Sequence, residues 1–327
     1  MKNLLLFYFA LTFSCPISAQ KPTDEGTITN LYDAFGKERA GLVMDFGFSC
    51  IIKYKGKIIL FDSGSNADKF EQNVRTLGVD LSKVDIAIAS HSHFDHINGF
   101  DYLLKVNPKV KIYYPNDIFW GADVPYDATG QEPAVQDSLP KEMRYFGGQK
   151  TKFSIQQSGR FWKANIEYVK ENKEILPGVK LVATASPFMG YFSRYPNMSF
   201  APGLFKDNLP NQANPPSNES KLPELSLSLT TDEGEILIVG CSHSSVEKIV
   251  EAAKAYTQQP IKLVYGGYHL LPFKRTDLLA LAKYLKTDLG VQKIAPAHCT
   301  GHLAFKLLKE AFGDSYVFAG LGETIKY

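Results

Sequence analysis

Histidine residues gather in four short patches of this 327-residue chain, and each patch also holds Gly, Ser, Cys or Asp. The patches lie at the ends of runs typical of β-strands, where a rigid scaffold projects ligands into a site built from loops. Imidazole, carboxylate and thiolate groups all bind transition metals, so the pattern predicts a dinuclear metal centre. All 7 histidines lie in His91-Ser92-His93-Phe94-Asp95-His96, Cys241-Ser242-His243, Gly266-Gly267-Tyr268-His269 and His298-Cys299-Thr300-Gly301-His302.

The first patch alone offers ligands for two ions. His91 and His93 lie two residues apart on extended or turning backbone, so their side chains point the same way and can bind one ion. Asp95 and His96 offer an oxygen and a nitrogen for a second ion. One ion lowers the pKa of bound water toward ~7, and a second ion ~3.5–4 Å away steadies the leaving oxygen. We therefore expect a metal-activated hydroxide at neutral pH, with Asp95 as a catalytic residue; the alternative is a solvated, histidine-rich loop.

The order H-x-H-x-D-H after an apolar run resembles the metallo-β-lactamase superfamily. Three later motifs, Gly240-Cys241-Ser242-His243, Gly266-Gly267-Tyr268-His269-Leu270 and Ala297-His298-Cys299-Thr300-Gly301, resemble its branch named for a 7,8-dihydropterin-6-methyl-4-(ribofuranosyl)aminobenzene 5′-phosphate synthase. The resemblance spans residues 28–115 and 174–327. It implies an α/β fold, an αβ/βα sandwich of the metallo-β-lactamase type with the site on one rim, and it leaves an irregular aromatic-rich insertion unaccounted for. It also implies two divalent metal ions, with zinc favoured over iron or manganese.

The resemblance adds ligands from the second half of the chain. It makes His298 complete the second metal site and places Cys241 at or between the metals, where a thiolate suits zinc or iron. The family pattern usually supplies a third histidine for the first metal from the strand matching residues 181–185, where this sequence has none. His243 is the first choice for this missing third ligand, and His269 is the second choice.

Other polar residues are predicted to touch the ligands or the substrate. Asp62 resembles the aspartate that steadies the metal loops in the superfamily, although it could simply cap the turn that follows it. His302, at the start of the last helix, and His269 are also predicted to contact the ligands or the substrate. Convergence of the ligands would also bring Cys241 and Cys299 close together, so a disulfide between them is left open.

Residues 1–19 have the features of a secretory signal: a lysine, an apolar run and small residues before Gln20. Cleavage after Ala19 is expected, which makes the protein periplasmic or secreted; lipid anchoring through Cys15 is the alternative. No second apolar run approaches the ~20 residues of a membrane span. Lys and Arg number 36 against 34 Asp and Glu, so no charge excess favours nucleic acid as a partner. Nothing in the sequence indicates an oligomeric state.

Apolar periodicity predicts alternating strands and helices. A single domain is expected over residues 20–327, with residues 115–173 and 186–223 as irregular insertions. Long irregular loops in compact domains are usually functional, so we interpret these segments as a substrate lid. The alternative is an ordinary surface loop that covers the core. Strands are expected at 27–35, 47–54, 57–61, 84–89, 109–114, 179–185, 225–230, 235–239, 262–265 and 293–296, and helices at 68–77, 97–105, 245–256 and 278–285.

These features predict an exported metallohydrolase that acts on a small phosphoester, ester or cyclic amide. One alternative is synthase or transferase chemistry on a pterin phosphate at the same metal platform, against which export weighs because pterin precursors are cytoplasmic. Another is a noncatalytic binding protein stabilised by metal. A redox role for an iron pair is a fourth hypothesis, which Cys241 as a soft ligand supports.

Overall fold

The computed structural model describes residues 26–115, 124–127, 132, 134–148, 152–155, 161, 164–186 and 222–327. The predicted signal peptide, Cys15 and nearly all of the 186–223 insertion lie outside these ranges, so the signal and the lid stay predictions. Within these ranges no helix combines the length and the apolar character that crossing a membrane requires.

The first half of the chain forms a mixed sheet that the C-terminal strand completes. In the described residues this sheet has seven strands in the order β15-β1-β2-β3-β4-β5-β8. β15, β1, β2 and β3 pair antiparallel, whereas β3, β4, β5 and β8 run parallel. The strands are β1 (Thr27–Tyr32), β2 (Ser49–Tyr54), β3 (Lys57–Phe61), β4 (Ile86–Ile88), β5 (Lys111–Pro115), β8 (Ile166–Val169) and β15 (Thr324–Lys326).

The second half forms another mixed sheet, with six strands among the described residues in the order β14-β13-β12-β11-β10-β9. β9 to β12 pair antiparallel, and β12, β13 and β14 run parallel. The strands are β9 (Lys173–Leu176), β10 (Val179–Ser186), β11 (Leu222–Thr231), β12 (Gly234–Val239), β13 (Ile261–Gly267) and β14 (Lys293–Ala297).

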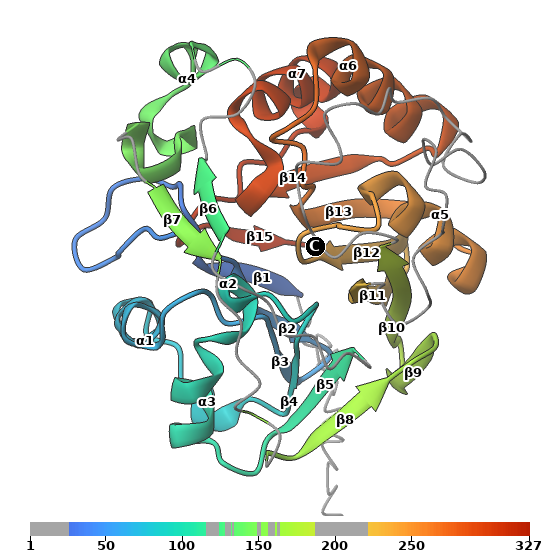
Figure 1. Cartoon of the computed structure of the whole chain (residues 1–327). Coiled ribbons are helices and arrows are strands. Elements are labelled where there is room, and N and C mark those ends of the chain that lie inside the picture. The colour runs from blue at the N-terminus through green and yellow to red at the C-terminus, as the bar shows by residue number, and fades with distance from the viewer. Residues whose placement is uncertain are drawn as a thin grey trace, which may run out of the picture.

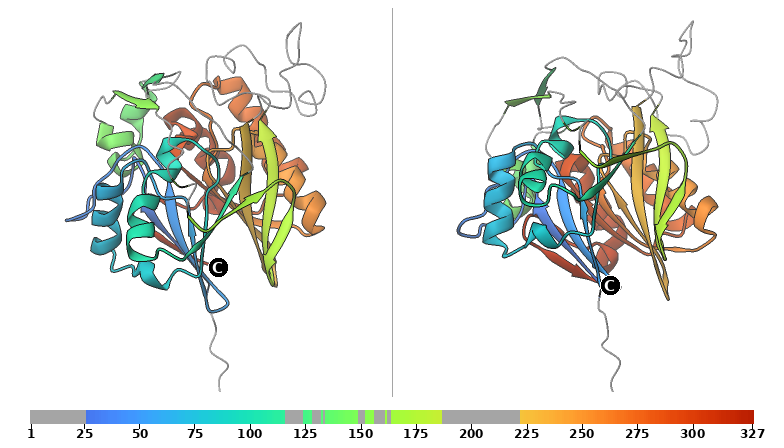
Figure 2. Two further views of the ribbon diagram at one scale, coloured as in Figure 1. Left: turned by 60° about the horizontal axis from the view of Figure 1, so that its bottom comes forward. Right: turned by 90° about the horizontal axis from the view of Figure 1, so that it is seen from below.

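Helices cover the outer face of each sheet, which gives four layers (Figures 1 and 2). Side chains alternate between the faces of a strand. On β12, Ile236 and Ile238 enter the core between the sheets, while Leu237 and Val239 pack against the outer helices. The helices are α1 (Ala67–Thr76), α2 (Phe94–Ile97), α3 (Phe100–Val106), α4 (Val135–Ser138), α5 (Val246–Thr257), α6 (Arg275–Lys283) and α7 (His302–Phe312).

The parallel strands explain why the histidine patches meet. Carboxyl ends of neighbouring parallel strands lie at one edge of a sheet, and loops there build sites. The patches follow β4, β12, β13 and β14, which are all parallel strands. The predicted αβ/βα sandwich with its site on one rim is therefore confirmed.

Three sequence predictions are wrong in detail. The segment 115–173 is not uniformly irregular: it contains β6 (Val124–Asp127), β7 (Lys152–Ile155), α4 and β8, which extends the first sheet. β8 is too short and too exposed to show a clear alternation. The helix predicted at 97–105 is α3, which begins at Phe100, and a separate turn, α2, places Asp95 and His96 in helical backbone. β1 ends at Tyr32, because Asp33 caps the backbone N–H of Ala34 there.

Candidate metal centre

Three histidines converge in the first group of candidate ligands. His91 and His93 come from the loop after β4, and His243 comes from the loop after β12. Nε2 of His91 lies 3.0 Å from Nδ1 of His93 and 3.2 Å from Nε2 of His243. His91 is fully buried, and His93 and His243 are 5% and 2% exposed. His243 thus lies with His91 and His93 in the first group, whereas His269 does not belong to it.

The chemistry of this group fits a metal ion. Burial lowers the pKa of His91 and His243 well below the usual range and that of His93 to about 4, so all three rings are neutral at pH 7. Neutral imidazole is the form that binds metals. Nδ1 of His91 is already held by Ser90 Oγ at 2.9 Å, which leaves its Nε2 facing the other two rings.

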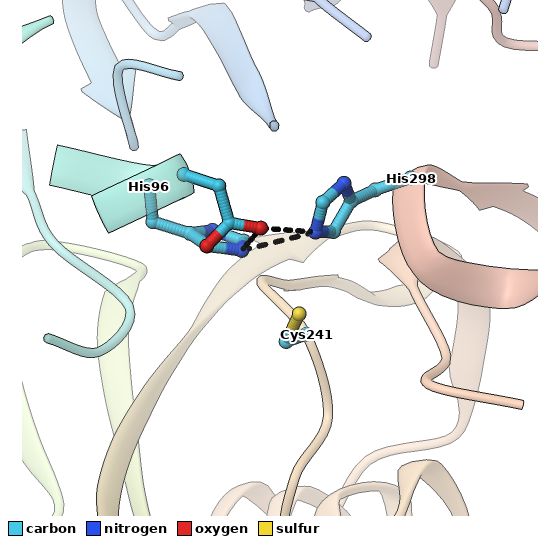
Figure 3. A group of neighbouring side chains, drawn as sticks. His96, Cys241 and His298 are labelled. Carbon is cyan, nitrogen blue, oxygen red and sulfur yellow. Dashed lines mark hydrogen bonds and ion pairs between the residues drawn. The ribbon is translucent and has the colours of Figure 1, made fainter. Parts of the chain in front are cut away.

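The second group combines Asp95, His96, Cys241 and His298. Nε2 of His298 lies 3.2 Å from Oδ2 of Asp95 and 3.2 Å from Nε2 of His96. Figure 3 shows the two rings pointing toward one another, with the Cys241 side chain pointing at both. A carboxylate, two imidazoles and a thiol form a donor set that suits zinc or iron.

The electrostatic surroundings of the second group favour a bound positive charge. Burial alone would raise the pKa of Asp95, but His96 and His298 beside it hold that pKa well below its usual range. Burial acts to lower the pKa of His298, yet Cys299 and Asp95 raise it well above the usual range. A buried position that keeps a carboxylate ionised and attracts a proton suits a divalent cation. The two groups adjoin, since the ring centroids of His91 and His96 lie 4.2 Å apart.

Asp62 connects both groups from behind. Its Oδ2 lies 2.6 Å from Nδ1 of His96, and its two oxygens accept hydrogen bonds from the Ser90 backbone and hydroxyl, each at 2.7 Å. The same hydroxyl contacts His91. One buried carboxylate therefore orients a ligand of each group, which is the role the resemblance implied. Its backbone φ of 55° lies in the left-handed region, a strained conformation that the surrounding contacts maintain.

Glu224, which the sequence analysis did not single out, holds the His243 loop. It is 3% exposed, and its two carboxylate oxygens accept the backbone N–H groups of His243 at 2.7 Å and Ser244 at 2.6 Å. Glu224 pairs in register with Thr184 on β10, the strand on which the family pattern places the missing histidine. A carboxylate beside that strand thus supports the loop that supplies the substitute ligand.

Two further residues, also absent from the sequence predictions, support the His298 loop. Asp33 accepts the His298 backbone N–H at 3.2 Å, and burial raises its pKa to about 7. Tyr145 donates its hydroxyl to the His298 carbonyl and accepts the Gly301 N–H at 2.7 Å. His298 itself has a φ of 48°, so these bonds stabilise a conformation that non-glycine residues seldom adopt.

The remaining predicted residues lie beside the two groups. His302 accepts the Tyr145 backbone N–H through Nε2 at 3.0 Å, so it contacts the support of a ligand and belongs to neither group. His269 packs its ring against His243 at 4.1 Å between centroids. Cys241 and Cys299 are free thiols whose sulfurs lie 3.2 Å apart, so the disulfide left open by the sequence is not formed.

Comparisons with known proteins agree with this geometry. Residues 43–166 match the family model of the metallo-β-lactamase superfamily. The 7,8-dihydropterin-6-methyl-4-(β-D-ribofuranosyl)-aminobenzene-5′-phosphate synthase of Methanocaldococcus jannaschii is 28% identical over 274 residues, which cover 83% of this chain and 85% of the relative. The crystal structure of Tm1679, a metal-dependent hydrolase of the β-lactamase superfamily, superposes with a TM-score of 0.65 at 22% identity and covers 92% of this chain and 99% of that one. The fold is shared with that hydrolase.

A shorter match concerns a protein of another activity. The endoribonuclease ysh1 of Aspergillus fumigatus is 40% identical over 73 residues, which are 21% of this chain and 8% of that protein. A balanced net charge therefore does not by itself separate this chain from relatives that cleave RNA.

Proposed function

We propose that this chain, which carries a domain of the metallo-β-lactamase superfamily over residues 43–166, is a metal-dependent hydrolase of a small phosphoester, ester or cyclic amide. The observation that carries the proposal is the contact between two buried donor groups, one of three neutral imidazoles and one that includes a carboxylate and a thiol. Two divalent ions held in such groups lower the pKa of water and polarise the bond that it attacks. Zinc is the favoured ion, because both donor sets suit it.

The protein side chains have separate tasks in this proposal. Asp95 stays ionised, so its Oδ2 can bind a cation or accept a proton from water beside His298. His91, His93 and His243 stay neutral and offer lone pairs. Asp62, Glu224 and Asp33 fix the loops, so the ligands need little rearrangement when the reaction begins.

A second candidate is the chemistry named for the methanogen relative. Its similarity over 83% of this chain favours a synthase or transferase that acts on a pterin phosphate. The same metal platform would serve either reaction, because a shared fold hosts many substrates. The noncatalytic alternative is less well supported, since His243 lies where a third ligand is needed.

We also propose that the protein is exported to the periplasm or secreted, on the signal-like character of residues 1–19. N-terminal sequencing of protein recovered outside the cytoplasm tests this proposal. A mature chain that starts at Gln20 would support cleavage after Ala19, a lipid-modified Cys15 would support anchoring, and an intact Met1 would contradict both.

Elemental analysis combined with a substrate panel tests the hydrolase proposal. Protein purified without added metal is analysed for zinc, iron and manganese, and is then assayed on a phosphodiester, a phosphomonoester, a lactone and a β-lactam. We expect about two or more ions per chain and hydrolysis that chelation abolishes and metal restores. Metal-loaded protein that hydrolyses none of these, yet condenses a pterin substrate with a ribosyl phosphate, would favour the second candidate.

A further inference from the structure

Three soft donors lie at the edge of the second sheet, and two of them belong to neither group of the dinuclear centre. Cys241, His269 and Cys299 have their ligand atoms within 4.8 Å of one another, and all three are buried. Cys241 is also a member of the second group, whereas His269 and Cys299 are not. These two residues therefore need a separate explanation.

The backbone brings the three donors together in a regular way. β12 ends at Val239, β13 at Gly267 and β14 at Ala297, so each donor lies two residues beyond the end of its strand. These three strands are parallel neighbours, which places the three loops side by side. The metal-binding loops of the dinuclear centre arise at the same edge.

A glycine on the middle strand permits the approach of the two sulfurs. β13 lies between β12 and β14, so Cys241 and Cys299 must meet over it. A Cβ at Gly267 would lie 3.0 Å from the Cys299 sulfur and 2.4 Å from the Gly240 carbonyl oxygen. Only a residue without a side chain leaves room for both loops at this position.

The spacing of the sulfurs favours a metal site over a disulfide. The sulfurs are 3.2 Å apart. A disulfide needs ~2.05 Å, which the loops would have to close by more than an ångström. Two thiolates on one tetrahedral zinc, at ~2.3 Å from the ion, lie roughly 3.8 Å apart, so a small separation suffices. An imidazole as third donor completes a set typical of a soft ion.

We propose that Cys241, His269 and Cys299 bind an additional soft divalent ion, such as zinc or iron(II), which shares the Cys241 thiolate with the dinuclear centre. Cys299 releases its thiol proton to solvent when the ion binds, whereas Cys241 is already a thiolate in the dinuclear centre, so binding is accompanied by the release of one proton. The protein then holds a three-ion cluster in which a thiolate-rich position adjoins the hydrolytic pair.

Metal counting on the full-length protein tests this site. Protein is prepared anaerobically with a reductant and saturated with zinc, and ions per chain are measured by elemental analysis. We expect about three ions in the wild type and about two in both Cys299→Ala and His269→Asn. Cys50→Ala is the matched control, because Cys50 is a buried cysteine of the central core, and it should keep three ions.

Cobalt gives a second readout that does not depend on activity. Thiolate-bound cobalt(II) has a charge-transfer band in the near ultraviolet, and three cobalt–sulfur bonds become one when Cys299 is removed, so the band should fall to about a third. Wild-type protein that holds only two ions after saturation with zinc would overturn the proposal. A Cys241–Cys299 disulfide in the zinc-saturated protein, seen as the loss of two hydrogens in mass, would also overturn it. A count of two ions leaves hydrolysis by the dinuclear centre unaffected, so the two proposals fail separately.

Discussion

The carboxylate of Glu224 accepts the backbone N–H of His243 at 2.7 Å. It also accepts the N–H of Ser244, so one side chain of β11 fixes the loop that carries a ligand of the first group. The neighbouring strand β10 places Thr184 opposite Glu224, at the point where the family pattern would supply its own histidine. The support and the substitute ligand thus arise from adjacent strands.

Replacing Glu224 should therefore weaken the first metal position. Glu224→Ala leaves two buried N–H groups without an acceptor, which costs ~2–5 kcal/mol of unfolding free energy and loosens His243. We expect occupancy to fall by about one ion in elemental analysis. Thr184→Val is the control, since it changes the opposite residue without touching the loop. Full occupancy in Glu224→Ala would show that His243 keeps its place without this carboxylate.

The candidate ligands can be recognised from the sequence alone, because their chemistry is local. The first patch carries residue types and spacing that suit two ions, and the strands before the patches have clear apolar runs. Residues that support the ligands leave no such signal. Glu224 reads as an ordinary polar residue at a strand end, and its role depends on a loop 19 residues away.

Contacts over long sequence separations were also missed. The pairing of β1 with β15 joins residues almost 300 apart, as in the hydrogen bond between Thr29 and Thr324 at 2.8 Å. Tyr145 lies in the segment predicted to be irregular, yet its hydroxyl contacts the His298 carbonyl. Such contacts follow from tertiary packing, which neither periodicity nor composition encodes.

Removing a ligand from each group tests the dinuclear reading directly. His93→Ala and Asp95→Ala should each release bound metal and lower hydrolysis by orders of magnitude, while circular dichroism stays native because both residues lie on the rim. Asp101→Ala, an exposed acidic residue on the next helix, is the control and should behave as the wild type. Unchanged metal content and activity in both ligand variants would end the proposal.

The sequence leaves His243 and His269 as alternatives for the third ligand of the first metal. Replacing each of them in turn distinguishes the two alternatives. His243→Ala should empty the first position, because its Nε2 lies 3.2 Å from that of His91. Asp95, His96 and His298 would keep their ion. His269→Ala should leave the His91 and His93 position filled, as measured by isotope-labelled zinc retention. Loss of that ion in His269→Ala, with His243→Ala silent, would transfer the role to His269.

Tyr145 should affect metal binding as well as stability. Tyr145→Phe removes a hydroxyl that bonds both the His298 carbonyl and the Gly301 N–H, which should cost ~1–3 kcal/mol of unfolding free energy. Because His298 is held less firmly, zinc affinity should fall about tenfold, as second-layer contacts of metal ligands typically show. Tyr54→Phe removes a hydroxyl that bonds the Thr230 carbonyl at 2.7 Å, away from the ligands. It should lower stability and leave zinc affinity unchanged; equal affinities in both variants would contradict the role of Tyr145.

Glu247 should give the protein a pH-dependent stability that is separate from the metal centre. It lies 5% exposed in the first turn of α5, and burial raises its pKa to about 7. An acid whose pKa is higher in the folded state contributes stability below its unfolded pKa of ~4.3, and that contribution disappears as the pH rises through 7. The unfolding free energy should therefore fall by about 3 kcal/mol between pH 4.5 and pH 7.5 through this residue. Glu247→Gln keeps the shape and lacks the charge, so the difference between the two urea-denaturation curves isolates the effect. A difference that is constant across this pH range would show that Glu247 ionises in the folded protein as it does in the unfolded chain.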